Sequence, residues 1–241
     1  MTISNTAPVY EIFFSFQGEG LYTGLPQIYV RFAGCNIKCR YCDTSYSTTI
    51  SKKANYYSQD KLIKIIYKIY KKNKKKFTFG RPFIIFTGGE PLIYADFLEL
   101  LTQKLKKIGF NIYLETNGTL TQNLKKIINF CDIVSMDFKF VSECKKSFWK
   151  EHRSFLETAV SNAAVKVLVK CVVTKNTNIY EIKKSADTIR GISKEIPLIL
   201  QPSIDKNIPE IQNLYRFYTK AKTIIPNVYL MVQMHKVYKI R

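Results

Sequence analysis

The chain has 241 residues, a formal net charge of +20 and a hydrophobic fraction of 46%. This length and composition predict a folded domain with a substantial core and exclude a disordered chain. The sequence has no apolar run of about eighteen residues and no secretory signal at its start, so neither a membrane-spanning helix nor export is expected. We therefore expect one domain in a reducing cytoplasm, where thiols serve metals and catalysis rather than disulfides.

Short apolar segments alternate with amphipathic segments along the chain. Seven segments are rich in β-branched or aromatic residues and bounded by Gly, Pro, Asn or Asp, which is typical of strands. The predicted strands are Ile28–Phe32, Phe83–Phe86, Asn111–Glu115, Ile133–Phe138, Val165–Val173, Leu198–Gln201 and Val228–Val232. Five further segments carry apolar residues at helical spacing. The predicted helices are Asp60–Lys72, Asp96–Ile108, Gln122–Asn129, Asn178–Ile192 and Glu210–Ile224.

Some helix boundaries can be predicted from single residues. Asp60 and Asp96 stand where an N-cap is expected, because a carboxylate there can accept from the N–H groups of the first turn. Gly109 and Gly191 stand where two helices should end. The segment Lys52–Tyr57 is predicted to be a polar loop before the first helix.

The alternation of strands and helices predicts an α/β fold built from right-handed βαβ units with a parallel sheet. About six such units are too few for an eight-stranded barrel. The expected architecture is therefore a partial (β/α)6-type barrel, with an open doubly wound sheet as the alternative. In both cases ligands bind at the C-terminal rim of the strands.

Three cysteines, Cys35, Cys39 and Cys42, follow the first predicted strand with the spacing C-x3-C-x2-C. Four thiolates normally hold a cubane iron–sulfur cluster, so three in one loop would leave one iron open to a ligand from outside the protein. A structural zinc site needs four nitrogen or sulfur ligands, and His152 and His235 are distant in sequence. The loop therefore favours an open-site iron–sulfur cluster.

Polar segments also end the next three predicted strands. They are Thr87–Pro91, which contains Gly88-Gly89-Glu90, then Glu115–Thr119, and finally the set Ser135, Asp137 and Lys139. Each alone could be a tight turn or the polar face of a strand. Because the C-terminal ends of parallel strands meet at one rim, the four ends together predict a single site.

The cysteine spacing, combined with Gly88-Gly89-Glu90-Pro91, resembles the radical S-adenosylmethionine (SAM) superfamily. The resemblance implies a single radical SAM domain over residues 1–241, with a [4Fe–4S] cluster held by Cys35, Cys39 and Cys42. SAM would chelate the open iron, and its reductive cleavage would give a 5′-deoxyadenosyl radical. The residues implied to contact SAM are Tyr41, Cys42, Asp43, Gly88, Gly89, Glu90, Glu115, Asn117, Ser135, Asp137, Lys139 and Gln201.

The segments Phe14–Gly20, Val30–Asn36, Cys42–Thr44 and Gln233–Lys236 are similar to the 7-carboxy-7-deazaguanine synthase family. This similarity implies a lyase that contracts the ring of 6-carboxy-5,6,7,8-tetrahydropterin to 7-carboxy-7-deazaguanine with loss of ammonia. The product serves queuosine-type 7-deazapurine biosynthesis and tRNA modification. A homodimer and a flavodoxin or ferredoxin reductant are also implied. The similarity is weakest over Val141–Ala163, and it assigns no site residue in that segment.

The same similarity implies roles at the substrate. Glu19 and Arg31 would act beside the cluster, with Arg31 holding the substrate carboxylate. Thr44 would ligate a Mg²⁺ that also binds the substrate. The full set implied to meet the pterin is Phe16, Gln17, Gly18, Glu19, Arg31 and Thr87, with His235 and the C-terminal Arg241 as further candidates.

Two other functions stay open at this stage. A glycyl-radical enzyme activase would share the cysteine loop and the Gly-Gly-Glu-Pro turn, but it would not need Gln17–Gly20 before the cluster. A basic, metal-stabilised nucleic-acid-binding module would fit the net charge and the run Lys71–Lys76. Lysines are spread over the whole chain, however, and lysines near a helix C-terminus suit the helix dipole, so nucleic-acid binding is the weaker interpretation. The other cysteines, Cys131, Cys144 and Cys171, are expected to be small buried side chains.

Overall fold

The computed structural model describes residues 5–77, 80–204 and 207–239. Within these residues nine strands form one sheet. They are β1 (Thr6–Phe16), β2 (Pro26–Phe32), β3 (Asn55–Ser58), β4 (Phe83–Gly88), β5 (Asn111–Thr116), β6 (Ile133–Asp137), β7 (Lys166–Val173), β8 (Leu198–Pro202) and β9 (Val228–Leu230). The order across the sheet is β3-β1-β2-β4-β5-β6-β7-β8-β9. Strand β1 is antiparallel to both neighbours, whereas each pairing from β2 through β4 to β9 is parallel.

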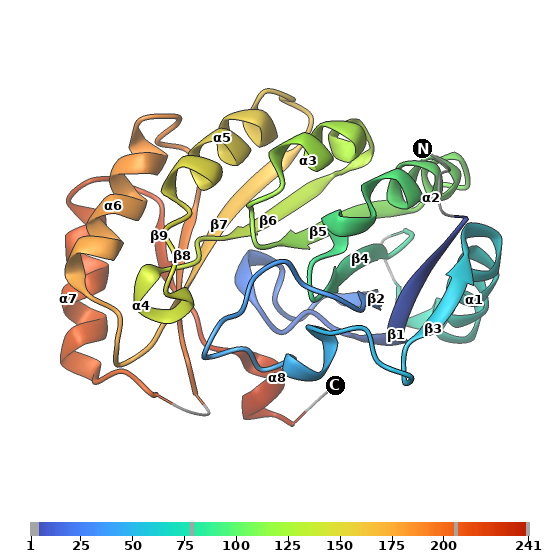
Figure 1. Ribbon diagram of the computed structural model, residues 1–241, viewed down its shortest axis with the longest axis horizontal. Coiled ribbons are helices and arrows are strands. Elements are labelled where there is room, and N and C mark those ends of the chain that lie inside the picture. Colours follow the sequence, from blue (N-terminus) through green and yellow to red (C-terminus); the bar gives the residue numbers. More distant parts are fainter. Residues whose placement is uncertain (1–4, 78–79, 205–206, 240–241) are drawn as a thin grey trace.

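Eight α-helices are present among the described residues; all but the last lie between successive strands, and the longer ones lie on the outer side of the sheet. They are α1 (Gln59–Asn73), α2 (Ala95–Lys107), α3 (Thr121–Ile127), α4 (Val141–Cys144), α5 (Trp149–Val160), α6 (Ile179–Arg190), α7 (Ile211–Lys222) and α8 (Met234–Val237). Figure 1 shows the longer helices as an arc around the outside of a curved, open sheet. None of the described helices is long and apolar enough to cross a bilayer.

The main hydrophobic core lies between these helices and the outer face of the sheet. Helix α1 buries Leu62 and Ile66 there, and α2 buries Leu98, Leu101 and Leu105 at helical spacing. The inner face packs a separate, smaller cluster to which the described α-helices contribute no side chain. One-sided coverage distinguishes a partial barrel from a doubly wound sheet, so the predicted partial barrel is confirmed.

The inner face of the sheet has two layers, because residues two apart on a strand share a face. The lower layer is apolar and consists of one residue from each of six parallel strands: Tyr29, Ile85, Tyr113, Ile133, Leu168 and Ile199. Two residues further along each strand stands a polar side chain of the upper layer. These six residues are Arg31, Thr87, Glu115, Ser135, Lys170 and Gln201. The apolar layer thus closes the barrel from below, and the polar layer faces the space above it.

All seven predicted strands and five predicted helices are present, with ends shifted by a few residues. Strands β1 and β3 and helices α4, α5 and α8 were not predicted. The predicted loop Lys52–Tyr57 is wrong from Asn55 onward, because this segment pairs with β1 as strand β3.

The predicted N-caps Asp60 and Asp96 are also wrong. Each aspartate lies in the first turn of its helix, and in α1 the Ser58 side chain accepts from the first turn instead. Gly109 and Gly191 do stand where α2 and α6 end, and Gly109 has a φ of +84°.

Candidate functional site

A cavity of about 210 Å³ lies above the polar layer, at the C-terminal ends of the parallel strands. The whole polar layer lines it, together with the three motif cysteines and the segment from Phe16 to Glu19. The C-terminal residues Gln233, His235 and Lys236 line it as well. The single rim site expected from the strand ends is therefore present as a cavity.

The three-cysteine loop follows β2 and forms one wall of the cavity. Cys35, Cys39 and Cys42 are half-buried thiols that line the same space. The start of the loop is fixed by backbone hydrogen bonds: the Gly34 N–H donates to the Ser47 carbonyl at 2.8 Å, and the Cys35 N–H donates to the Thr48 carbonyl at 2.9 Å. Three thiols on one loop, all reaching one cavity, are a donor set that fits a cluster with one open iron.

A fourth cysteine lies next to this loop. The Cys144 sulfur, at the end of α4, is 3.2 Å from the Cys39 sulfur. The hydrogen bond between these thiols outweighs burial and lowers the pKa of Cys39 to about 7. Helix α4 is held there by Arg40, whose backbone N–H donates to the Glu143 carbonyl at 3.2 Å and whose side chain lies 3.6 Å from the Glu143 carboxylate. Cys131 and Cys171 are buried as predicted, whereas Cys144 is half-buried beside the cluster loop, so its prediction is wrong.

The glycine pair after β4 lets two backbone segments touch. Gly88 has a φ of +132°, and a Cβ at Gly88 or Gly89 would overlap the backbone of Phe32 or Gly34. The Gly89 N–H donates to the Phe32 carbonyl at 3.1 Å, and the next N–H donates to the Gly34 carbonyl at 2.8 Å. The glycines are therefore required where this turn packs against the cluster loop, and both also line the cavity.

Glu90 lies behind the cavity wall rather than in it. Its side chain is fully buried and is not among the cavity-lining residues. The carboxylate accepts from the backbone N–H groups of Leu92 and Asn117, at 3.0 and 2.8 Å, and from the Thr116 hydroxyl at 2.8 Å. The Glu90 side chain does not line the cavity, and its contact with SAM stays a prediction. Glu90 instead joins the glycine turn to the turn after β5.

The other residues expected at SAM do line the cavity near the cluster loop. The Lys139 ammonium donates to Asp137 at 2.7 Å and to the Tyr41 hydroxyl at 3.3 Å. Burial alone would lower the pKa of Lys139, but the Asp137 charge raises it well above its ordinary value. The Asn117 amide donates to Asn36 at 2.8 Å. Gln201 is fully buried, and neither of its amide atoms has a hydrogen-bond partner among the described residues, so it can bind a polar ligand group.

The residues expected at the substrate form the opposite wall. Gln17 donates to Glu115 at 3.0 Å and accepts from the Tyr29 hydroxyl at 3.2 Å. The Arg31 Nε donates to Glu11 of β1 at 2.9 Å, which fixes the guanidinium at the cavity edge. Phe16, Gly18, Thr87 and His235 also line this wall, whereas Arg241 lies outside the described residues.

The cavity residues to which the sequence assigned no role include Lys170, Gln233 and Lys236. The Gln233 amide donates to Glu19 at 2.8 Å, and the Lys236 ammonium lies 3.3 Å from the Asp43 carboxylate. The C-terminal segment thus reaches both walls. Lys170 pairs with Glu19 from below.

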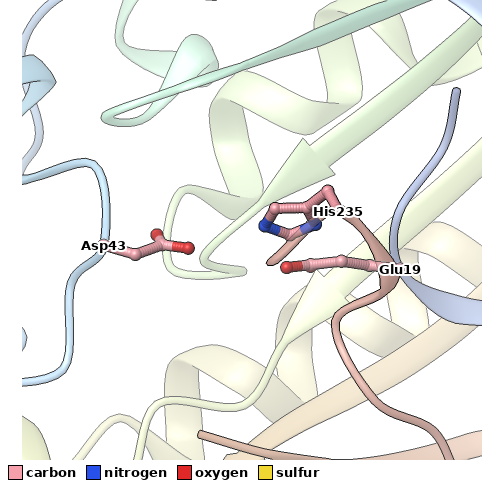
Figure 2. Close-up of side chains that lie close together, drawn as sticks. All are labelled: Glu19, Asp43 and His235. Carbon is pink, nitrogen blue, oxygen red and sulfur yellow. The ribbon is translucent and has the colours of Figure 1, made fainter. Parts of the chain in front are cut away.

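Glu19, Asp43 and His235 come from three distant segments and converge on one point, with ligand atoms that all lie within 4.8 Å of one another (Figure 2). Two carboxylates and an imidazole could hold a divalent cation. In the structure the ammonium groups of Lys170 and Lys236 compensate the two carboxylates. Thr44, the expected Mg²⁺ ligand, follows Asp43 in the chain and lines the same cavity.

Comparisons with known proteins agree with this geometry. The family model of the radical SAM superfamily matches residues 29–189. A 7-carboxy-7-deazaguanine synthase from Geobacter sulfurreducens is 35% identical over 208 residues, which cover 81% of this chain and 81% of that protein. The chain belongs to the 7-carboxy-7-deazaguanine synthase family of radical SAM enzymes.

Other comparisons extend over nearly the full length of this family member. A 7-carboxy-7-deazaguanine synthase from Methanocaldococcus jannaschii is 31% identical over 245 residues, covering 95% of this chain and 98% of that protein. The crystal structure of QueE from Escherichia coli covers 95% of both chains with a TM-score of 0.63 and 22% identity, and supports the fold. A [4Fe–4S] cluster and SAM are therefore the cofactors of this enzyme, and the three thiols and the unpaired Gln201 amide fit them.

Proposed function

We propose that this chain forms a single domain that converts 6-carboxy-5,6,7,8-tetrahydropterin to 7-carboxy-7-deazaguanine. The observation that supports this proposal most strongly is the set of side chains that line the cavity. It joins the three-cysteine loop to an amide, a carboxylate and a guanidinium, contributed by Gln17, Glu19 and Arg31. A pterin presents an amide edge, an exocyclic amine and, in this substrate, a carboxylate, which are complementary to those three groups.

Cys35, Cys39 and Cys42 would hold the cluster at the wall of the cavity that the loop after β2 forms. When bound, the cluster and SAM together supply an organic radical that takes a hydrogen atom from the substrate. Gln201 would offer its unpaired amide to a polar group of SAM. Asp137 and Lys139, already paired at 2.7 Å, would present a fixed dipole to the same ligand.

At the opposite wall Arg31 would bind the substrate carboxylate, with its guanidinium oriented by Glu11. Gln17 and Glu19 would bind the edge of the pterin. Burial alone would raise the pKa of Glu19, but the Lys170 charge and the hydrogen bonds from Gln233 and Lys170 lower it to about 2. Glu19 would therefore be ionised at every working pH and act as an acceptor. The C-terminal segment would keep water from this end of the cavity.

Thr44 would ligate Mg²⁺ at the substrate, as proposed from the sequence. A flavodoxin or ferredoxin would supply the electron, a homodimer would be the working form, and the reducing cytoplasm would be its location. The participation of Gln17 and Glu19 in the cavity favours a small-molecule substrate over the activase alternative. The residues Lys71–Lys76 are not among those that line the cavity, so no observation ties the basic run to this chemistry.

The test is an anaerobic assay of the reconstituted protein with SAM, reductant, Mg²⁺ and the tetrahydropterin, followed by mass spectrometry. Formation of 7-carboxy-7-deazaguanine is the expected result. If only 5′-deoxyadenosine and methionine accumulate, the substrate assignment is wrong while the radical chemistry stands. An assay that yields neither set of products contradicts the whole proposal.

A further inference from the structure

Lys170 is a charged side chain in the middle of β7, within the otherwise apolar run Val167–Val173. Its exposed fraction is 9%, and it stands in the polar layer directly above Leu168 of the apolar layer. The neighbouring residues Val169 and Cys171 point to the opposite face and are buried in the main core. A lysine in such a position costs free energy unless opposite charges compensate it. The side chain therefore has a role that apolar packing alone does not provide.

Two carboxylates compensate Lys170, and they belong to different walls of the cavity. The ammonium pairs with Glu19, on the segment after β1, and lies 3.3 Å from Asp137, on β6. Each carboxylate uses its other oxygen elsewhere: Glu19 accepts from Gln233 at 2.8 Å, and Asp137 accepts from Lys139 at 2.7 Å. Lys170 is thus the group that both walls share.

The charged groups around Glu19 show that the ionisation of this carboxyl depends on the Lys170 ammonium. Lys170 faces it from β7, His235 from α8, Asp43 from the cluster loop and Glu115 from β5. Burial is the main cause that raises the pKa of Tyr29 of β2, and the charges of Glu115 and Glu19 add to it. Asp43 and Glu115 carry the same charge as Glu19 and oppose its ionisation. Without Lys170, therefore, burial and these like charges would together favour the neutral carboxyl.

We propose that Lys170 is a positioning residue of the reaction, holding the Glu19 carboxylate ionised and oriented at the substrate while it is itself anchored to Asp137. This inference rests on the proposed function, because it assigns Glu19 to the pterin. It explains why a lysine occupies a polar-layer position on β7. It also predicts that substrate recognition depends on pH once the ammonium is removed, because a neutral Glu19 donates a proton where the substrate needs an acceptor.

The test compares wild type with Lys170→Met, Lys170→Arg and the control Lys166→Met, which removes an exposed lysine from the same strand. Each cluster-loaded variant is assayed for kcat and for the KM of the pterin between about pH 5.5 and 8. In Lys170→Met we expect KM to rise roughly tenfold to hundredfold, because this is the change in affinity that the loss of one charge-assisted hydrogen bond produces. The rise should be larger at low pH, a dependence absent from wild type. Lys170→Arg should recover most of the KM, and Lys166→Met should match wild type.

A second measurement needs no substrate. The ¹³C carboxyl resonance of Glu19, assigned by its loss in Glu19→Gln, is titrated in the wild-type and Lys170→Met chains. We expect no titration of Glu19 above about pH 4 in wild type and a clear midpoint above that value in the variant. An unchanged KM profile together with an unchanged Glu19 titration would overturn the inference.

The two measurements separate this inference from the proposed function. If wild type makes no product but Glu19 titrates as expected, the function is wrong and the electrostatic role of Lys170 stands. If wild type is active and Lys170→Met behaves like Lys166→Met, the function stands and the inference is wrong. Should Lys170→Met fail to load iron, Lys170→Gln supplies the test, because it keeps a polar side chain but removes the charge and should raise KM most at low pH without changing iron content.

Discussion

The buried carboxylate of Glu90 accepts a hydrogen bond from the backbone N–H of Asn117 at 2.8 Å, although the residues are 27 positions apart in the chain. The contact fixes the turn after β5 against the glycine turn after β4. Asn117 in turn reaches the cluster loop, because its side-chain amide lies 3.9 Å from the Cys35 sulfur and donates to Asn36 at 2.8 Å. Glu90 therefore stabilises the turns that form the cavity wall, and this structural role requires no contact with a ligand.

Burial raises the pKa of Glu90 to about 7, against the three hydrogen bonds that lower it. Because the folded-state pKa exceeds the ordinary 4.5, the neutral form favours folding; this contribution is complete below about pH 4.5 and is lost as the pH rises through about 7. The shift corresponds to roughly 3 kcal/mol. In urea unfolding, the stability of wild type should therefore fall relative to Glu90→Gln by up to that amount between about pH 5 and 8. If the unfolding free energies of wild type and Glu90→Gln changed in parallel with pH, the raised pKa of Glu90 would be contradicted.

Gly18 has no room for a side chain, because a Cβ there would overlap the imidazole of His235. The backbone N–H of Met234 also donates to the Gly18 carbonyl at 2.9 Å. Gly18→Ala should displace the C-terminal segment, with an overpacking cost of about 1–3 kcal/mol. Limited trypsin digestion should then cleave faster at Lys236. Because the added Cβ would overlap the His235 Cβ as well as its ring, His235→Gly rather than His235→Ala should restore protection. A Gly18→Ala/His235→Gly double variant as sensitive as Gly18→Ala would contradict the steric explanation.

Arg31 is expected to bind the substrate carboxylate through the part of its guanidinium that Glu11 does not use. Arg31→Ala should raise the KM of the pterin roughly a hundredfold, the scale of one charged hydrogen-bond pair, while the iron content stays at the wild-type level. Arg31→Lys should recover only part of this loss, because an ammonium cannot bind a carboxylate bidentately. If Arg31→Ala lost iron, Arg31 would instead be assigned a structural role in supporting the cluster loop.

The sequence predicted the parallel strands because their apolar runs are local, but it did not predict elements whose pattern depends on tertiary contacts. Strand β1 contains Pro8 and Glu11, which interrupt its alternation, and it is stabilised as a strand by pairing with β2 and β3. Helix α5 was not predicted because the polar residue His152 occupies a fully buried position on its apolar face and interrupts the helical pattern of apolar residues. Its imidazole stacks on Phe138, and burial lowers the pKa of His152 to about 3, so it behaves as a neutral core residue.

The same distinction applies to the site. The cysteine loop and the strand-end turns are continuous in sequence, so their convergence at one rim follows from the parallel sheet. Gln233 and Lys236 reach the cavity because the chain returns to it after β9. Their segment carries the family similarity, but a role at the site was implied only for His235. Lys170 did leave a signal, since it is a charge within the apolar run of β7, four residues after the exposed Lys166 at the start of the strand. Glu90 is the opposite case, because its motif predicts a ligand contact whereas its buried carboxylate accepts hydrogen bonds from Leu92, Thr116 and Asn117.

Magnesium could bind through Thr44, or through the cluster of Glu19, Asp43 and His235. Lysines already compensate the two carboxylates of that cluster, so we expect Thr44 to be the ligand. Thr44→Ala should reduce the stimulation of turnover by Mg²⁺, and Thr44→Ser, which keeps the hydroxyl, should retain it. The measurement is the rate as a function of Mg²⁺ concentration. A normal response in Thr44→Ala combined with its loss in Asp43→Asn would assign the ion to the acidic cluster.

Cys144 is close to the cluster loop, yet we expect it not to be a cluster ligand. Its sulfur is 3.2 Å from that of Cys39, so the two thiols cannot occupy separate iron corners unless α4 moves away from Arg40, which holds it. Cys144→Ser should therefore bind as much iron as wild type after anaerobic reconstitution, whereas Cys39→Ser should lose most of it. The electron paramagnetic resonance spectrum of the reduced Cys144→Ser cluster should still change when SAM is added, because the open iron is unaffected. If Cys144→Ser lost iron, or if SAM no longer changed its spectrum, Cys144 would be the fourth ligand and the site would not be open.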